Sequence, residues 1–249
     1  PMQRPFAQCR SGRKSVWQNK HTSTYLHMEQ IWQDVAEWIN LLAQTLRIPT
    51  SFLLIEFIGT FAFALSGIRL ASAKQFDIFG AWIVGMATAI GGGTFRDVML
   101  GVNPFWMTNE IYFIWCALAV LFVHIFAKYL VKQKNTWFIF DTIGLALFNV
   151  VGIEKTLQMG FPMWTAITMG SVTGAAGGVI RDVLINEVPL IFRKEIYALA
   201  CVAGGIVYSA LHVLEFDPNI SALFSSIVVI AVRCLAVKFH WHLPIVKGE

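Results

Sequence analysis

The chain has 249 residues, of which 56% are hydrophobic and only 14% are charged. A soluble domain carries about 25% charged residues, so this composition excludes an ordinary soluble protein and indicates an integral α-helical membrane protein. The formal net charge of +4 is small, and the sequence shows no interleaving of basic and aromatic residues of the kind that binds nucleic acid.

The N-terminal part of the chain divides into two segments of different character. Residues 1–28 are basic and polar and contain no apolar run of the kind found in a signal peptide. We expect this segment to be disordered, or to be an extension foreign to the domain. Residues 29–48 predict an amphipathic helix lying on the membrane surface, ended by Pro49, because apolar side chains recur there at helical spacing. These side chains are Ile31, Val35, Trp38, Leu42 and Leu46.

Seven apolar segments follow, each near the roughly 20 residues that a helix needs to cross a bilayer. We place them at 50–69, 79–100, 109–130, 136–155, 163–185, 195–214 and 219–238. The first three are expected to form one repeat, over residues 49–130, and the next three a second repeat, over 136–214. The segment at 219–238 is then a seventh helix outside the duplication, and residues 239–249 form a tail.

One motif occurs twice at a constant spacing of 85 residues. Residues 91–98 read GGGTFRDV, and residues 176–183 read AGGVIRDV. The register continues on both sides, so that Glu-Ile-Tyr at 110–112 returns at 195–197. Because each repeat has an odd number of helices, the second copy enters the membrane from the opposite side, as in an inverted repeat.

The loops predict an orientation in the membrane. Basic residues gather on one side of this topology, which the positive-inside rule assigns to the cytoplasm. The C-terminus is then cytoplasmic and the N-terminus lies outside, although the basic residues at 1–28 argue against that orientation. The basic residues on the cytoplasmic side are Arg69, Lys74, Lys128, Lys132, Lys134, Arg193, Lys194, Lys238 and Lys247.

The glycine motifs suggest interrupted helices. Each glycine costs a helix about 1 kcal/mol relative to alanine, so the second and fifth helices are expected to be kinked or locally unwound. An unwound turn exposes carbonyl oxygens that can replace part of a cation's hydration shell, and threonines one turn earlier could add hydroxyl ligands. The alternative is close packing of helices through small residues. The candidate path residues are Gly91, Gly92, Gly93, Gly177, Gly178, Thr88 and Thr173.

Each glycine motif is followed by an Arg-Asp pair inside its helix: Arg96-Asp97 and Arg181-Asp182. An arginine near the bilayer centre costs roughly 2.5–3.5 kcal/mol on insertion scales. Because adjacent residues on a helix do not face one another, we expect each of these residues to have a partner on another helix. They are candidates for a gate or charge pairs in an ion path. The alternative is a residue at the membrane interface that fixes the end of its helix.

Two further acids, Glu56 and Asp141, are equivalent in the 85-residue register. They could form electronegative vestibules that attract cations, or they could be N-terminal carboxylates favoured by the helix dipole. The sequence contains no nucleophile, metal or phosphate constellation, and the glycine run at 91–93 is not a P-loop. We therefore expect neither an enzyme nor a cofactor.

The motifs GGGTFRDVMLG…P and AGGVIRDVL…P resemble the signature of a bacterial membrane family. That family is catalogued as the glycine-transporter domain family, formerly of unknown function, and contains the prokaryotic relatives of the trimeric intracellular cation (TRIC) channels. The resemblance covers about residues 53–238. It implies seven membrane-spanning helices in two inverted repeats, with helices 2 and 5 kinked at their glycines, and location in the bacterial cytoplasmic membrane. It also implies a homotrimer with one ion path in each protomer. Ala176 replaces the first glycine of the second motif, so a milder kink is expected there.

Three functional hypotheses follow. The first is a homotrimeric channel that passes potassium or sodium, chiefly potassium. Its partners would be other copies of the chain and membrane lipids, and a lipid could also be bound to it. The second is a secondary transporter of a small zwitterion such as glycine, held by the ends of the broken helices. The third is a structural scaffold, in which the glycines and charges only pack helices.

Overall fold

The computed structural model describes residues 28–41, 50–132, 136–193 and 196–241, in two units that divide after Thr50. In the first unit, residues 28–41 are helical, and the side chains of Ile31, Val35 and Trp38 are exposed. The position of this helix on a membrane surface stays a prediction. The predictions for residues 1–27, 42–48 and 242–249 concern parts of the chain outside the described residues.

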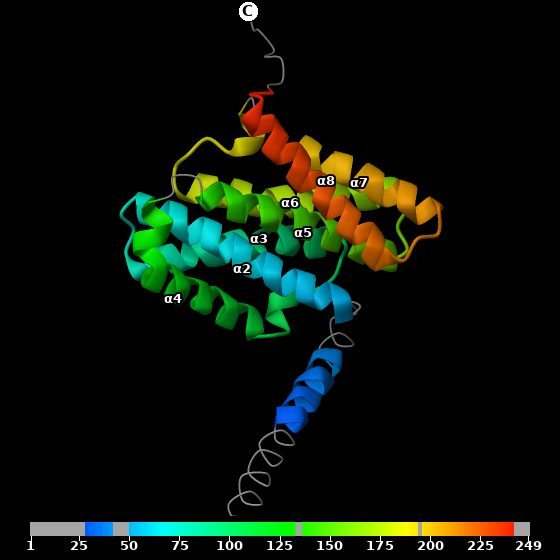
Figure 1. Cartoon of the computed structure of the whole chain (residues 1–249), viewed down its shortest axis with the longest axis horizontal. Coiled ribbons are helices and arrows are strands. Elements are labelled where there is room, and N and C mark those ends of the chain that lie inside the picture. The colour runs from blue at the N-terminus through cyan, green and yellow to red at the C-terminus, as the bar shows by residue number, and fades with distance from the viewer. Residues whose placement is uncertain (1–27, 42–49, 133–135, 194–195, 242–249) are drawn as a thin grey trace, which may run out of the picture. The chain divides into compact units, whose positions relative to one another are not determined.

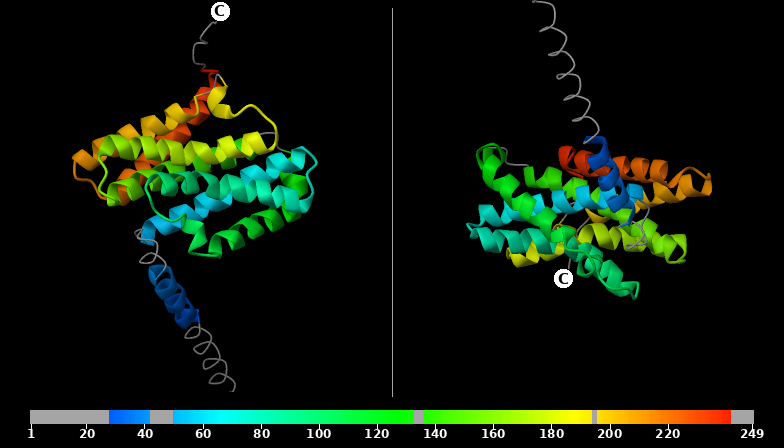
Figure 2. Two further views of the ribbon diagram at one scale, coloured as in Figure 1. Left: turned by 180° about the vertical axis from the view of Figure 1, so that it is seen from behind. Right: turned by 90° about the horizontal axis from the view of Figure 1, so that it is seen from below.

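In its described part the second unit consists of helices joined by turns and loops, with no strand, which confirms the all-α prediction (Figure 1). Further views show that the helices lie side by side (Figure 2). Two short 3₁₀ helices, η1 (Phe105–Met107) and η2 (Leu190–Phe192), occur at equivalent places in the two repeats. The long helices are α2 (Thr50–Ala73), α3 (Ile78–Met99), α4 (Ile111–Lys132), α5 (Thr136–Gln158), α6 (Met163–Leu184), α7 (Ala198–Val213) and α8 (Pro218–Lys238).

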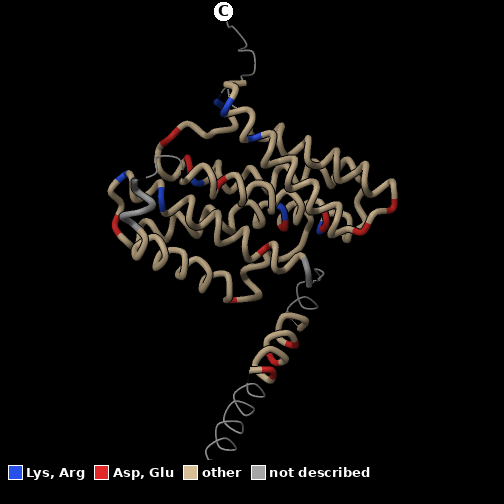
Figure 3. The backbone as a smooth tube through the Cα atoms, in the orientation of Figure 1, with Lys and Arg blue, Asp and Glu red and all other residues tan. Residues whose placement is uncertain are grey.

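Four of these helices, α2, α3, α5 and α8, are long and apolar enough to cross a membrane. The described parts of α4 and α7 are apolar but shorter. Helix α6 contains Arg181 and Asp182 and packs against α3, α5 and α7, which shield its polar residues. Charged residues lie mainly near the helix ends, with a few inside the bundle (Figure 3). Seven membrane spans therefore stay a prediction for α4, α6 and α7.

The C-termini of α3 and α6 are built alike, because the duplicated sequence supplies equivalent residues there. Gly101 and Asn186, which are 85 residues apart, both have positive φ, at 72° and 56°. Their backbone amides donate to Val98 and Val183, and the next amides donate to the carbonyls of Asp97 and Asp182. This pattern is a Schellman motif, in which a left-handed residue satisfies the last carbonyls of a helix.

Helices α3 and α6 cross at their glycine motifs with almost no space between their backbones. A Cβ atom at Gly92 would overlap the carbonyl oxygen of Thr173, and one at Gly177 would overlap that of Thr88. These reciprocal contacts show that the two helices run antiparallel and are related by a pseudo-two-fold axis. The hydroxyl groups of Thr88 and Thr173 are buried and each donates to a carbonyl one turn earlier, on Val84 and Met169.

The aromatic core between α2 and α5 follows the same symmetry. Phe63 and Phe148 stack with their ring centroids 5.3 Å apart and their planes 12° from parallel. A Cβ at Gly144 would meet Phe63, and one at Gly59 would meet Phe148. The four residues therefore pack as two equivalent pairs, each glycine making room for the ring from the other repeat.

The glycine motifs do not interrupt their helices. Both α3 and α6 remain α-helical through Gly91–Gly93 and Gly177–Gly178, so the expected unwound turn is wrong. The physical reason is tertiary packing, because the close approach of neighbouring atoms at these glycines offsets their low helix propensity. A kink at the motifs stays a prediction.

Candidate functional site

Two groups of buried charged residues lie on opposite sides of the α3–α6 crossing. The first charge cluster consists of Glu56, Arg96, Asp97 and Lys155, and the second consists of Asp141, Arg181, Asp182 and Arg233. Because α3 and α6 are antiparallel and each cluster lies near the C-terminal end of one of them, the clusters lie toward opposite ends of the bundle.

In each Arg-Asp pair, the arginine donates a hydrogen bond to the aspartate that follows it in the sequence. Arg96 Nε donates to Asp97 Oδ1 over 2.8 Å, and Arg181 Nε donates to Asp182 Oδ1 over 2.9 Å. The expectation that sequence neighbours would not pair is therefore wrong. Near the last turn of its helix, the long arginine side chain can fold back to reach the adjacent carboxylate. The second oxygen of each carboxylate accepts from a backbone amide at the start of a 3₁₀ helix, that of Phe105 or Leu190.

Glu56 and Asp141 are fully buried, so neither carboxylate is exposed at the surface as the first of the two alternatives requires. Each accepts a hydrogen bond from the tyrosine of the repeated Glu-Ile-Tyr segment. Tyr112 donates to Glu56 Oε2 over 3.1 Å, and Tyr197 donates to Asp141 Oδ1 over 3.3 Å. Both tyrosine side chains are buried and cover the acids from α4 and from the segment before α7.

The second cluster is densely paired. Arg181 Nη1 donates to Asp141 Oδ1 over 2.5 Å and to Ser66 Oγ over 2.8 Å, which ties α6 to both α5 and α2. Arg233 of α8 places Nη2 3.4 Å from Asp141 Oδ2, and its guanidinium lies 4.7 Å from the ring centroid of Tyr197. Two arginines therefore share one buried carboxylate.

The first cluster is paired differently. Lys155, which belongs to the second repeat, places Nζ 3.0 Å from Asp97 Oδ1. Glu56 Oε1 and both terminal nitrogens of Arg96 are buried and have no hydrogen-bond partner among the described residues. The guanidinium of Arg96 lies 5.8 Å from the Phe105 ring centroid. The duplicated residues thus adopt a tightly paired arrangement in one cluster and a looser one in the other.

The structure brings Glu56 together with Arg96 and Asp97, and Asp141 together with Arg181 and Asp182. Sequence reasoning missed five other participants. A lone charge in an apolar segment was the signal for Arg233, and a polar residue in a repeated tripeptide was the signal for the tyrosines. Lys155 is the last residue of the apolar segment predicted at 136–155, where a charged residue is not a signal of a buried site. The missed residues are Ser66, Tyr112, Lys155, Tyr197 and Arg233.

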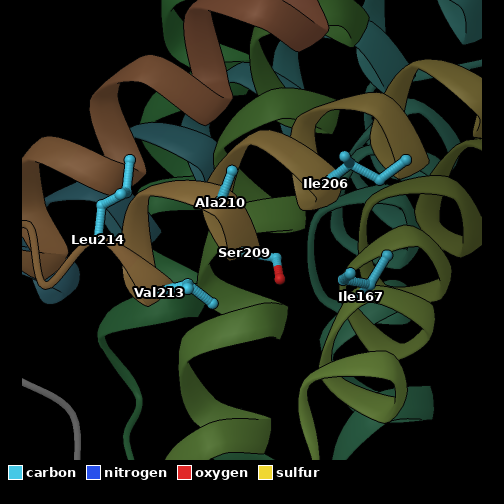
Figure 4. Close-up of a pocket in the computed structure, with 6 residues that line it drawn as sticks. All are labelled: Ile167, Ile206, Ser209, Ala210, Val213 and Leu214. Atoms are coloured by element: carbon cyan, nitrogen blue, oxygen red, sulfur yellow. The ribbon is translucent and has the colours of Figure 1, made fainter.

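A surface groove between α6 and α7 has a volume of about 500 Å³. Ile167 lines it from α6, and Ile206, Val213 and Leu214 line it from α7 and its C-terminal cap, with Ser209 as the polar lining residue (Figure 4). An apolar lining of this kind does not suit an ion, so the groove is not a candidate path. Among the residues that the structure describes, no group of three or more His, Cys, Asp or Glu side chains could hold a metal ion.

An apolar, internally duplicated helical bundle with charges buried toward both ends defines a class of integral membrane protein. The family model described as "Glycine transporter" matches residues 53–128 and again 138–213, two segments offset by 85 residues. The chain belongs to this family of membrane proteins.

Two curated relatives agree with this assignment. A UPF0126 membrane protein of Vibrio cholerae is 37% identical over 206 residues, which cover 79% of this chain and 84% of the relative. The UPF0126 inner membrane protein YadS of Escherichia coli K12 is 34% identical over 197 residues, which cover 76% of this chain and 93% of the relative. Both are named as membrane proteins.

Solved structures give the same result. A TRIC trimeric intracellular cation channel orthologue from Rhodobacter sphaeroides matches with a TM-score of 0.73 and 32% identity, covering 77% of this chain and all of the other. A chain from work on conductance through TRIC cation channels matches with a TM-score of 0.70 and 32% identity, covering 79% of this chain and 97% of the other. These matches confirm the resemblance to prokaryotic TRIC channels.

Proposed function

We propose that the protein is a homotrimeric channel for monovalent cations, chiefly potassium, with one path inside each protomer. The observation that carries this proposal is the pair of buried charge clusters on opposite sides of the α3–α6 crossing. Charged residues inside a membrane protein usually mark an ion or substrate path, because they are costly to place there.

The path would run past the crossing of α3 and α6. Asp97 and Asp182 would attract the cation from either end, while Arg96 and Arg181 would hold each acid in place and set the barrier. The tight contact between Gly92 and the Thr173 carbonyl supports a closed state. Conduction would require α3 and α6 to separate slightly, so that Thr88, Thr173 and the glycine carbonyls could take up part of the hydration shell.

The similarity to TRIC channels supports the trimer, because those proteins are named as trimeric cation channels. The bacterial relatives support location in the cytoplasmic membrane, since one of them is named as an inner membrane protein. An outside N-terminus, a cytoplasmic C-terminus, seven spans and bound membrane lipid remain parts of the proposal, and the basic loops support the orientation.

A second candidate is a carrier of a small zwitterion such as glycine. The description of the matched family favours it. So does the first charge cluster, where the carboxylate oxygen of Glu56 and two guanidinium nitrogens of Arg96 have no hydrogen-bond partner among the described residues. A carboxylate and an ammonium group on one ligand could satisfy both kinds of atom.

Neutralising the two motif acids separates these functions. In liposomes, Asp97→Asn and Asp182→Asn should each lower potassium flux by about tenfold or less, because a carboxylate acts mainly by raising the local cation concentration. A zwitterion carrier that relies on these acids should instead lose saturable uptake of labelled glycine. Wild-type liposomes that take up glycine but pass no potassium would contradict the channel proposal, provided that the protein is shown to be folded and inserted.

A further inference from the structure

A small pocket opens at the end of the bundle where α2 and α6 end and α5 begins. It has a volume of about 250 Å³, and Trp137 and Asp182 are among the residues that line it. Asp182 is only 3% exposed and is bonded to Arg181, which in turn is bonded to Asp141. The pocket therefore leads from the surface to the second charge cluster, and we name it the vestibule.

Three further lining residues are exposed and carry charge. Lys74 Nζ lies 2.6 Å from Glu187 Oε1, and Arg193 Nη2 lies 3.3 Å from Glu187 Oε2. The side chains of all three are about 40% exposed, whereas that of Asp182 is 5% exposed. The ion pairs therefore lie at the mouth of the vestibule, and Asp182 lies at its floor. Arg193 is also held in place because its Nε donates to the Val188 carbonyl over 2.8 Å.

The Lys74–Glu187 ion pair joins the two repeats. Lys74 follows the last residue of α2 in the first repeat, and Glu187 lies in the loop after α6 in the second. The hydrogen bond and the charge of Lys74 hold the pKa of Glu187 below its usual value, so the carboxylate is ionised at neutral pH. A link between repeats at the mouth of a pocket can control access only if it can break, and exposed ion pairs are weak enough to do so.

Among the described residues, the opposite end of the bundle has no equivalent ion pairs. In the 85-residue register, the positions equivalent to Lys74, Glu187 and Arg193 are Met159, Val102 and Thr108. None of these side chains carries a charge. The ion pairs are therefore an addition to one end of an otherwise duplicated structure, and packing of the repeat does not require them.

We propose that Lys74, Glu187 and Arg193 form a charge latch that closes the vestibule and regulates the access of monovalent cations to Asp182. This inference rests on the proposed channel function. When Lys74 and Glu187 separate, the loop after α6 is free to move from the end of α2, and the carboxylate of Asp182 becomes accessible. Because an exposed ion pair shifts an equilibrium by a factor of about five or less, the latch biases the gate and does not lock it.

A double-mutant cycle tests the latch. Full-length protein carrying Lys74→Gln, Glu187→Gln or both is recorded in planar bilayers, and its thermal unfolding is measured in parallel. Each single variant should raise the open probability by about two- to fivefold, with the single-channel conductance unchanged. The double variant should match Glu187→Gln, because that substitution alone already breaks both ion pairs of the latch.

Glu110→Gln provides the matched control, since Glu110 is an exposed acid in a loop before α4, at the end of the bundle without a latch. It should leave the open probability unchanged. Glu187→Asp, which shortens the side chain but keeps the charge, should change the open probability in the same direction as Glu187→Gln. If the wild type conducts and the single variants leave the open probability unchanged, or their effects simply add, the latch is overturned while the channel stands. A silent wild type overturns the channel and the latch together.

Discussion

Replacing Gly92 or Gly177 with leucine is expected to abolish ion flux. At these positions even a Cβ atom would overlap a backbone carbonyl of the opposite helix, on Thr173 or Thr88, and a backbone cannot move aside as a flexible side chain can. Leucine would distort the packed α3–α6 crossing, and its side chain would fill the space between the two helices through which the proposed path runs. Extra atoms in a packed core typically cost about 1–3 kcal/mol or more. Potassium flux in liposomes and thermal unfolding in detergent measure the two consequences.

A milder pair of substitutions controls for the general effect of changing a glycine. Gly91→Ala places its Cβ against the far end of the Ile180 side chain, which can turn away, and alanine also favours the helix. Gly92→Ala, one residue later, meets a carbonyl oxygen. Gly91→Ala should therefore keep most of the wild-type flux, whereas Gly92→Ala should lose most of it. Equal flux in the two variants would show that the close crossing has no role in conduction.

Asp141→Asn is expected to be among the most destabilising single substitutions in the chain. Asp141 is fully buried and balances Arg181 and Arg233, both of which are also fully buried. Removing one partner of a buried ion pair costs about 3–5 kcal/mol, because the remaining charge is left uncompensated. Chemical unfolding of the purified protein in detergent should show a loss of stability of that order.

Glu56→Gln is the matched substitution, because Glu56 occupies the equivalent position in the first repeat. The Glu56 carboxylate accepts a hydrogen bond from Tyr112, and its other oxygen has no hydrogen-bond partner among the described residues. We therefore expect a clearly smaller loss of stability than for Asp141→Asn. An equal or larger loss for Glu56→Gln would contradict the expectation that the denser pairing of the second cluster contributes more to stability.

Much of this architecture could be predicted from the sequence, because duplication leaves a register that can be read directly. The 85-residue spacing relates Gly92 to Gly177 and Thr88 to Thr173, and the structure places these residues in reciprocal contact. Apolar length alone located the seven helices to within a few residues of their observed ends.

Side-chain partners were harder to predict, because they depend on geometry that the register does not contain. Helical spacing excludes contacts between neighbours along a helix, yet Arg96 reaches Asp97 because an arginine side chain is long and flexible. Lys155 has no charged counterpart in the first repeat, since its equivalent is Leu70, and Arg233 lies in the seventh helix, outside the duplication. Reasoning from symmetry therefore missed both.

The glycine motifs show a further limit of reading sequence by propensity. Three glycines in a row predict a broken helix when the helix is considered alone. In the structure, α3 continues through them because neighbouring atoms occupy the space beside each glycine. These atoms belong to Ile180 at Gly91, to the Thr173 carbonyl at Gly92 and to Phe105 at Gly93. Here packing between helices outweighs local propensity.

The most direct test of the channel proposal is single-channel recording of the purified wild-type protein in a planar bilayer under a potassium chloride gradient. The proposal expects discrete current steps that reverse near the equilibrium potential of potassium. Protein that is shown to be folded and inserted but gives no current, or current that reverses near the chloride equilibrium potential, would contradict it.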